Sequence, residues 1–196
     1  MSLVQAVVSA VAPHPAVERI ELVGSRAEGR ETNWSDWDFA VWTRDFAAVA
    51  ATLPELLARF EPLVQQWDRL GEEYCWMLLL AGPVKVDLIF PGRLHEKEPP
   101  WRPARENLDE LDAHFWDWVL WLCGKEAAGK TELVEVELEK LFGHVLGPLG
   151  VERQPGSVAE AVESYRAARE RAERRFRVSV RREVEQAVAP ALASAS

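Results

Sequence analysis

The sequence is short of several residue types that define whole classes of protein. It has two cysteines in 196 residues, and both lie in apolar segments, as buried free thiols do in a reducing compartment such as the cytoplasm. Its four histidines are far apart in the chain and form no zinc signature. No apolar run approaches the roughly 20 residues that cross a bilayer. The sequence therefore predicts a cytoplasmic protein without structural disulfides, structural zinc or a membrane span.

Basic residues are also outnumbered. The chain has 23 lysines and arginines against 32 aspartates and glutamates, which gives a formal net charge of −9. Positive charge supplies most of the affinity for a polyanion, so we do not expect nucleic acid as a partner. An acidic surface suits a small cationic molecule better. The hydrophobic share of 48% is ordinary for a globular chain of one large or two small domains.

The hydrophobic pattern of residues 1–95 predicts a domain with strands and helices. An apolar stripe predicts a first helix over about 3–12, and a second helical segment starts near Asp45. The capping-box pattern Thr52-Leu53-Pro54-Glu55 indicates that this second helix stops and restarts there. Alternating or apolar runs predict strands, with a hairpin between the last two. The predicted strands are 17–23, 37–43, 74–80 and 84–90, and 63–68 alternates weakly.

The pattern changes after this domain. A proline-rich connection over 96–106 leads into a helical domain at 107–190, so the predicted fold class is α+β. The expected helices are about 107–124, 132–146 and 158–188, the last of which begins at the capping box of Ser157 and Glu160. We expect the Ala/Ser-rich tail at 191–196 to be disordered.

The most informative segment joins a glycine-serine turn to a pair of aspartates. A predicted strand ends at Gly24-Ser25, and ten residues later Asp36-Trp37-Asp38 opens the next strand. Residues two apart in a strand point the same way, so the two carboxylates face one side. They repel unless a cation lies between them, and Mg²⁺ prefers such oxygen ligands. The glycine allows a phosphate to approach the backbone closely, and the serine adds a hydroxyl and an N–H. This pattern predicts metal-assisted phosphoryl or nucleotidyl transfer.

A third carboxylate lies in an otherwise apolar strand. Asp87 belongs to the run 84–90, in which Lys85 is the other polar residue. Burying a charge is costly unless it is paired or bound to a metal. If this strand lies beside the one that carries Asp36 and Asp38, three carboxylates converge on one or two Mg²⁺ ions. The competing interpretation of Asp87 is an ion pair with Lys85, which we do not expect to form.

These motifs together resemble the nucleotidyltransferase superfamily with the DNA polymerase β-like fold. Gly24–Gly29 and Ser35–Asp38 look like the corresponding segments of small antibiotic nucleotidyltransferases and minimal nucleotidyltransferases. The resemblance implies a polymerase β-like catalytic domain, followed by the helical one, that uses Mg²⁺, as two ions, and ATP or another nucleoside triphosphate. The metal ligands that it implies are Asp36, Asp38 and Asp87, the last of which is alternatively the general base.

The resemblance also implies which residues hold the triphosphate. Gly24 and Ser25 correspond to the phosphate-binding turn. Glu28 stands where a basic residue is common in the family, so Arg26 or Arg30 is expected to contact the phosphates instead. In the second half, the aromatic run 114–118 followed by Lys125 is similar to the helical domain of aminoglycoside nucleotidyltransferases, especially the streptomycin adenylyltransferase type. That similarity implies that Lys125 reaches the triphosphate.

A rival phosphate-binding motif lies at residues 124–131, where Gly-Lys-Glu-Ala-Ala-Gly-Lys-Thr matches the P-loop expression. We disfavour it because Lys-Glu-Ala-Ala favours a helix, whereas a phosphate nest needs a loop wrapped around the anion. No later apolar strand ends in an aspartate that would supply a second magnesium ligand.

The predicted activity is Mg²⁺-dependent transfer of a nucleoside monophosphate, AMP, from the triphosphate to a hydroxyl of a small molecule, with release of pyrophosphate. A cationic aminoglycoside-like antibiotic fits the acidic balance, and antibiotic resistance is then the expected role. Two alternatives stay open: adenylylation of a partner protein, as in minimal nucleotidyltransferases of toxin–antitoxin pairs, and non-catalytic nucleotide binding. The alternative general bases beyond Asp87 are Glu96, Glu98 and Glu106.

Overall fold

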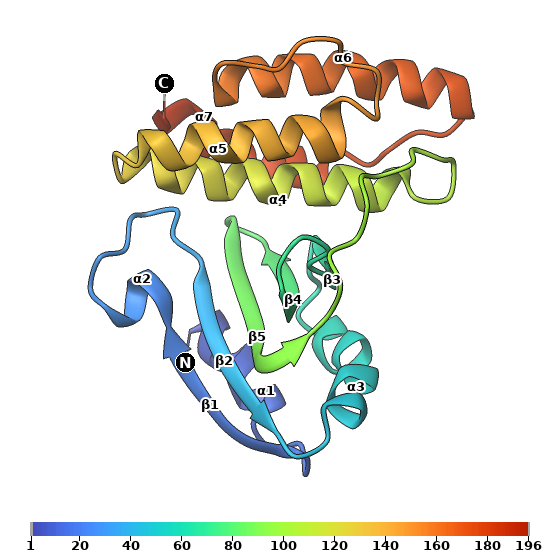
Figure 1. Ribbon diagram of the computed structural model, residues 1–196. Coiled ribbons are helices and arrows are strands. Elements are labelled where there is room, and N and C mark those ends of the chain that lie inside the picture. The colour runs from blue at the N-terminus through green and yellow to red at the C-terminus, as the bar shows by residue number, and fades with distance from the viewer. Residues whose placement is uncertain (1, 196) are drawn as a thin grey trace. The chain divides into compact units, whose positions relative to one another are not determined.

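The computed structural model describes residues 2–195, which form two compact units (Figure 1). The first unit contains the chain up to Glu31 and Ser35–Glu98, and the second contains Thr32–Trp34 and the chain from Pro99 onward. The first holds a five-stranded mixed sheet with helices and the second is helical, so the fold class is α+β as predicted. Over residues 2–195, no helix has both the length and the apolar character that a membrane crossing needs.

The sheet of the first unit has the strand order β1-β2-β5-β4-β3. Its strands are β1 (Val17–Val23), β2 (Trp37–Thr43), β3 (Val64–Trp67), β4 (Glu73–Leu80) and β5 (Val84–Leu94). β2 and β5 are parallel, and the other neighbouring pairs are antiparallel. The expected strands and hairpin are confirmed, but β5 runs further than predicted, through Pro91. The pairing of β4 with β5 is irregular between Glu73 and Cys75, opposite this part of β5, and a proline without an N–H is tolerated at such an irregularity.

The core of the first unit lies between one face of the sheet and the helices α1 (Leu3–Val11) and α3 (Phe46–Ala58). In β5 the residues that enter this core are Val86, Leu88 and Phe90, all fully buried. Because side chains alternate along a strand, Lys85 and Asp87 point to the opposite face. The alternation therefore places the polar residues of β5 on the face away from the two helices.

The predicted interruption of the helix after Asp45 is wrong. α3 is continuous from Phe46 to Ala58 with Pro54 inside it, and its N-cap is Asp45, whose side chain accepts from the N–H of Ala48 at 3.1 Å. The hydroxyl of Thr52 donates to the carbonyl of Val49 at 2.9 Å and so stays within the helix. The fully buried Leu53 packs in the core, and this packing offsets the cost of an internal proline.

The second unit consists of α4 (Leu108–Ala127), α5 (Thr131–Leu141) with a π-helical turn at Phe142–Leu146, α6 (Val158–Phe176) and α7 (Glu183–Ala195). The single helix predicted over 158–188 is instead two. α6 ends at Phe176, its C-cap Arg177 adopts the left-handed conformation at φ 53°, and the Glu173 carboxylate accepts from the N–H of Val180 at 2.7 Å. The side chain of Glu173 in the last turns of α6 thus binds the backbone of the loop that leads to α7.

The prediction of a disordered tail at 191–196 is also wrong as far as the structure describes it. α7 continues to Ala195, and Val188 and Ala191 are fully buried. α7 packs along α4. The small side chains of the tail, which predict fraying in isolation, allow this close approach of two helices. Ser196 lies outside the described residues.

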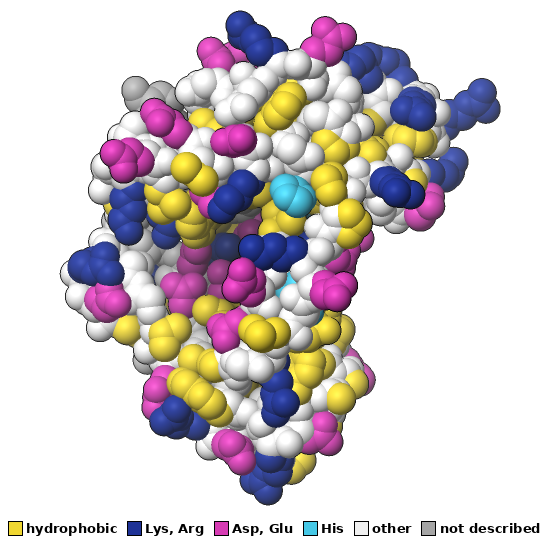
Figure 2. Space-filling model, in the orientation of Figure 1, with side chains coloured by type: hydrophobic (Ala, Val, Ile, Leu, Met, Phe, Trp, Pro, Cys, Tyr) yellow, Lys and Arg dark blue, Asp and Glu magenta, His cyan; other side chains and the backbone are white. Residues whose placement is uncertain are grey.

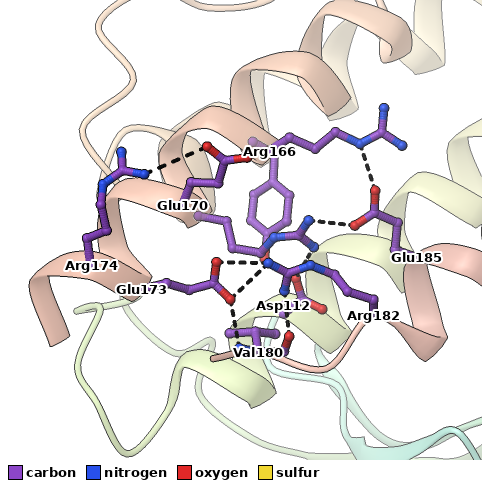
Figure 3. A network of polar contacts seen from close by, with 10 residues as sticks. Asp112, Arg166, Glu170, Glu173, Arg174, Val180, Arg182 and Glu185 are labelled. Atoms are coloured by element: carbon purple, nitrogen blue, oxygen red, sulfur yellow. Dashed lines mark hydrogen bonds and ion pairs between the residues drawn. The ribbon is translucent and has the colours of Figure 1, made fainter. Parts of the chain in front are cut away.

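A buried polar network ties three helices of the second unit together (Figure 3). Asp112 on α4 accepts from the hydroxyl of Tyr165 at 2.7 Å and from the guanidinium of Arg169 at 2.9 Å, both on α6. Arg169 also donates to Glu185 on α7. Burial raises the pKa of Asp112, while the hydrogen bonds from Tyr165 and Arg169 oppose that shift. The network therefore supplies the partners that a carboxylate with 2% exposure requires.

Replacing Arg169 by methionine should destabilise the second unit by about 3 kcal/mol, because the buried carboxylate of Asp112 then loses its positively charged partner. The matched control is Arg174→Met, since Arg174 pairs with Glu170 on the surface of the same helix at 3.8 Å. An exposed pair of this kind contributes about 0.5 kcal/mol or less. Urea unfolding of both variants measures the difference, and equal destabilisation would contradict the assigned role of Arg169.

The net charge of −9 is unevenly spread. Lys and Arg side chains gather over the C-terminal end of α6 and the loop that follows it (Figure 2). The exposed arginines of this segment are Arg171, Arg174, Arg175, Arg177 and Arg181. The acidic excess therefore falls on the rest of the chain.

Candidate carboxylate site on the sheet

Three aspartates meet on the face of the sheet that points away from α1 and α3. Asp38 and Asp87 are direct neighbours in the parallel pairing of β2 with β5, and Asp36 immediately precedes β2. One carboxylate oxygen from each of the three lies within 4.8 Å of the others. The structure thus brings together the three side chains that the sequence singles out as metal ligands. Asp36 contributes from the residue just before β2, whereas Asp38 and Asp87 lie within strands.

The site is largely shielded from solvent. Asp36 is 7% exposed and Asp87 8% exposed, while Asp38 is half-buried. Oδ1 of Asp36 is buried and has no hydrogen-bond partner among the described residues. Three carboxylates at this distance repel one another strongly in a low-dielectric environment. The donor set is all oxygen and partly unsatisfied, which fits a hard divalent cation such as Mg²⁺.

Lys85 contributes a positive charge to the aspartate cluster, which was not expected from the sequence. Its Nζ lies 3.2 Å from Oδ2 of Asp87 and 3.8 Å from Oδ2 of Asp36. The expectation that Lys85 and Asp87 do not pair is therefore incorrect. The reason is the period of the strand: residues two apart share a face, so Lys85 and Asp87 emerge side by side from β5.

The glycine-serine turn packs directly against this cluster. Gly24 opens a single helical turn, α2 (Gly24–Ala27), and has φ +68°, a conformation that L-residues rarely adopt. A Cβ at this position would lie 2.2 Å from Oδ2 of Asp38. The turn therefore requires glycine for two reasons, its backbone conformation and the close approach of the Asp38 carboxylate. Ser25 follows it and is half-buried.

Arg26 has a positional role that sequence reasoning missed. Its guanidinium donates to the carbonyl of Ser35 at 2.7 Å and to that of Asp36 at 3.0 Å, and it stacks over the ring of Trp37 at 4.2 Å. It thereby fixes the backbone that presents the carboxylate of Asp36. From the sequence, an arginine beside a phosphate-binding motif is expected to bind phosphate. Its actual partners, the carbonyls of Ser35 and Asp36, are nine and ten residues away and cannot be recognised from the neighbouring residues.

The other residues predicted to bind nucleotide have different surroundings. Arg30 is exposed and forms an ion pair with Glu28, the acid that departs from the family pattern. Lys125 lies in the last turn of α4, in the second unit, where its Nζ is 4.5 Å from the ring centroid of Trp121. The roles assigned to both stay predictions.

The P-loop-like motif does not have the structure of a P-loop. Gly124–Ala127 form the end of α4, and a short turn leads to Lys130, the N-cap of α5. A P-loop follows a strand, whereas this segment follows a helix. In the sequence Lys-Glu-Ala-Ala the first three residues are helical and Ala128 is the C-cap of α4, so these backbone N–H groups do not form a nest for phosphate.

A hollow of about 600 Å³ adjoins Asp87 in the first unit. Four of its lining residues are acidic, and no lysine or arginine lines it. The acidic lining residues are Asp68, Glu72, Glu73 and Asp87. Glu72 pairs with Lys97 at 3.3 Å and Asp68 accepts from the N–H groups of two neighbours, so the free negative charge of the hollow is less than its composition indicates. The hollow forms between residues 68–75 and β5, which are separated in the chain, so no local sequence pattern predicts it.

Neither a known protein family nor a curated protein matches the sequence. Among solved structures, the chain is similar to an aminoglycoside 6-adenyltransferase from Bacillus subtilis, with 10% sequence identity over 98% of each chain and a TM-score of 0.35. A score this low does not establish a shared fold.

Proposed function

We propose that the chain is a Mg²⁺-dependent nucleotidyltransferase, which moves AMP from ATP to a hydroxyl of an acceptor molecule. The observation that carries this proposal is the cluster of Asp36, Asp38 and Asp87 held against the Gly24 turn. Asp36 and Asp87 are buried and Asp38 is half-buried, and carboxylates this close repel one another. Lys85 offsets one of the three negative charges, and a bound cation would offset the rest. A glycine turn against the same carboxylates adds a place for the substrate phosphates.

The residues of the site fit the metal by their chemistry. Mg²⁺ takes oxygen ligands and usually keeps positions for water and for substrate phosphate. Asp36, Asp38 and Asp87 would hold it, and Oδ1 of Asp36, which accepts no hydrogen bond from the described residues, would serve as an oxygen ligand. When bound, the cation neutralises the triphosphate and stabilises charge on the entering and leaving oxygens.

The chain's own residues then divide the remaining work. The backbone at Gly24 and the hydroxyl of Ser25 bind the β- and γ-phosphates, and Arg26 keeps Asp36 in position. The acceptor hydroxyl attacks the α-phosphorus, the bond from that phosphorus to the bridging oxygen of pyrophosphate breaks, and the hydroxyl proton passes to a carboxylate. Asp87 is one candidate for that base.

Three glutamates beyond Asp87 are the other candidates for the base. Glu96, Glu98 and Glu106 are all exposed. Glu98 pairs with Arg69, so it is the least available of the three. Replacing each by glutamine and measuring the pH dependence of transfer would separate them from Asp87.

A small cationic acceptor, of the aminoglycoside type, completes the proposed function. The hollow beside Asp87 supports this choice, because four of its lining residues are acidic and, within residues 2–195, only Glu72 and Asp87 of these pair with a lysine. Opposite charge raises the local concentration of a polyamine and orients it. An antibiotic acceptor would make the protein a resistance enzyme.

The test incubates the full chain with Mg²⁺ and ATP together with streptomycin, kanamycin or gentamicin. We expect pyrophosphate release and an AMP adduct, detected by mass spectrometry, on at least one of them. One control omits Mg²⁺, and another replaces ATP in turn by GTP, CTP and UTP. An AMP adduct only on a co-expressed protein would instead assign protein adenylylation. Nucleotide binding without pyrophosphate release on any acceptor would contradict the enzymatic proposal.

A further inference from the structure

Lys85 occupies a position inside the carboxylate cluster. Its side chain is 7% exposed, and its Nζ lies 3.2 Å from Oδ2 of Asp87 and 3.8 Å from Oδ2 of Asp36. On the next strand its direct neighbour is the fully buried Leu79. A buried ammonium needs nearby negative charge, and these two carboxylates supply it.

The charges of these four side chains favour a single divalent ion. Three carboxylates carry −3, and the ammonium reduces this to −2, which one divalent cation neutralises. Charges a few ångströms apart repel strongly where water is excluded. A second divalent ion bridging Asp36 and Asp87 would have to share their Oδ2 atoms with Lys85. The lysine therefore stands where the second ion of a two-metal site would bind.

We propose that Lys85 is a resident cation of the site, which takes the place of a second divalent ion, so that the nucleotide-free protein binds one such ion rather than two. This inference rests on the proposed function, because it assumes that the aspartates bind metal. It departs from the two-ion expectation that the family resemblance raises. Lys85 acts here as a positioning residue: it holds Asp36 and Asp87 in place without contacting the reacting phosphate.

The test counts the Mn²⁺ ions that bind to the nucleotide-free full chain, by calorimetry and by the electron paramagnetic resonance signal of free Mn²⁺. We expect one ion on the wild type, two on Lys85→Met and on Lys85→Gln, and one on Lys85→Arg, which keeps the charge. The control is Lys97→Met, which removes an exposed lysine paired with Glu72 and should leave one ion. Asp38→Asn serves to show that the counted ions bind at the aspartates.

The same titration is followed by thermal melting. Lys85→Met should melt at a lower temperature than the wild type without metal, because Asp36 and Asp87 lose their counter-charge, and excess Mn²⁺ should raise its melting temperature more than that of the wild type. One ion on both uncharged variants, or a failure of Mn²⁺ to restore a destabilised variant, would overturn the inference. So would two ions on the wild type, although the metal site would then stand. No Mn²⁺ on any variant would refute the proposed function itself.

Discussion

Asp38→Asn should lower the rate of AMP transfer by roughly a thousandfold or more while leaving the first unit folded. A bound cation contributes several kcal/mol to stabilising the transition state, and each tenfold in rate corresponds to about 1.4 kcal/mol. Asp38 is the aspartate to change because its carboxylate lies against the Gly24 turn and its backbone pairs in register with Asp87. Removing one of three like charges also relieves repulsion in the metal-free protein, so folding should not suffer.

The matched control for this prediction is Asp45→Asn. Asp45 is an exposed aspartate of the same unit, and asparagine caps a helix as well as aspartate does, so α3 should be unaffected. Thermal melting provides a second readout that does not depend on knowing the acceptor. At a concentration of Mg²⁺–ATP a hundred times its Kd, the wild type and the control should gain about 2.7 kcal/mol of stability. If Asp38→Asn gains as much, Asp38 does not hold the metal.

Gly24→Ala should lower kcat/KM by roughly a thousandfold through a single added methyl group. The new Cβ would lie 2.2 Å from Oδ2 of Asp38, so the carboxylate has to move away from the cluster. Disturbing the support of a metal ligand costs about 10- to 100-fold in metal affinity, and misplacing reacting groups by an ångström costs about a hundredfold in rate.

Gly29→Ala is the matched control, because Gly29 has nearly the same backbone conformation, φ +65°, with nothing within 4 Å of the added Cβ. Both variants lose about 1–2 kcal/mol of stability to the left-handed backbone, but only Gly24→Ala should lose Mg²⁺–ATP affinity, measured by calorimetry. Lys130→Ala, in the P-loop-like segment, should bind nucleotide as the wild type does. Equal losses in the two glycine variants would mean that strain alone, and not contact with Asp38, explains the requirement for glycine.

Part of the candidate site could be predicted from local sequence patterns. Gly24 could be singled out because a glycine after a strand allows a phosphate to approach the backbone closely, and Asp87 because a carboxylate in an apolar strand needs a partner. What the sequence left open was whether Asp38 and Asp87 meet. They are distant in the chain, and their pairing depends on β5 lying beside β2 rather than at an edge of the sheet.

Arg26 and Lys85 mark the limit of this reasoning. Both are cations beside the motif, and sequence patterns favour a phosphate role for Arg26 and no role for Lys85. In the structure Arg26 holds the backbone of Ser35 and Asp36, and Lys85 pairs with two of the aspartates. The partner of a long, flexible charged side chain depends on which groups the fold places within its reach, and adjacent residues in sequence do not reveal them.

The amino-acid sequence by itself determined the α+β class, the strands that carry the aspartates and the glycine turn, because alternation and turn chemistry act over a few residues. Only the tertiary structure decided that α3 passes through Pro54, that α6 and α7 are separate helices and that the tail from 191 is helical up to Ala195. Each of these depends on burial against a distant element: Leu53 in the core, the Glu173 side chain on the loop at Val180, and Ala191 in the second unit. Packing of this kind outweighs local propensity, since the free energy of burying a side chain exceeds most differences in helix preference.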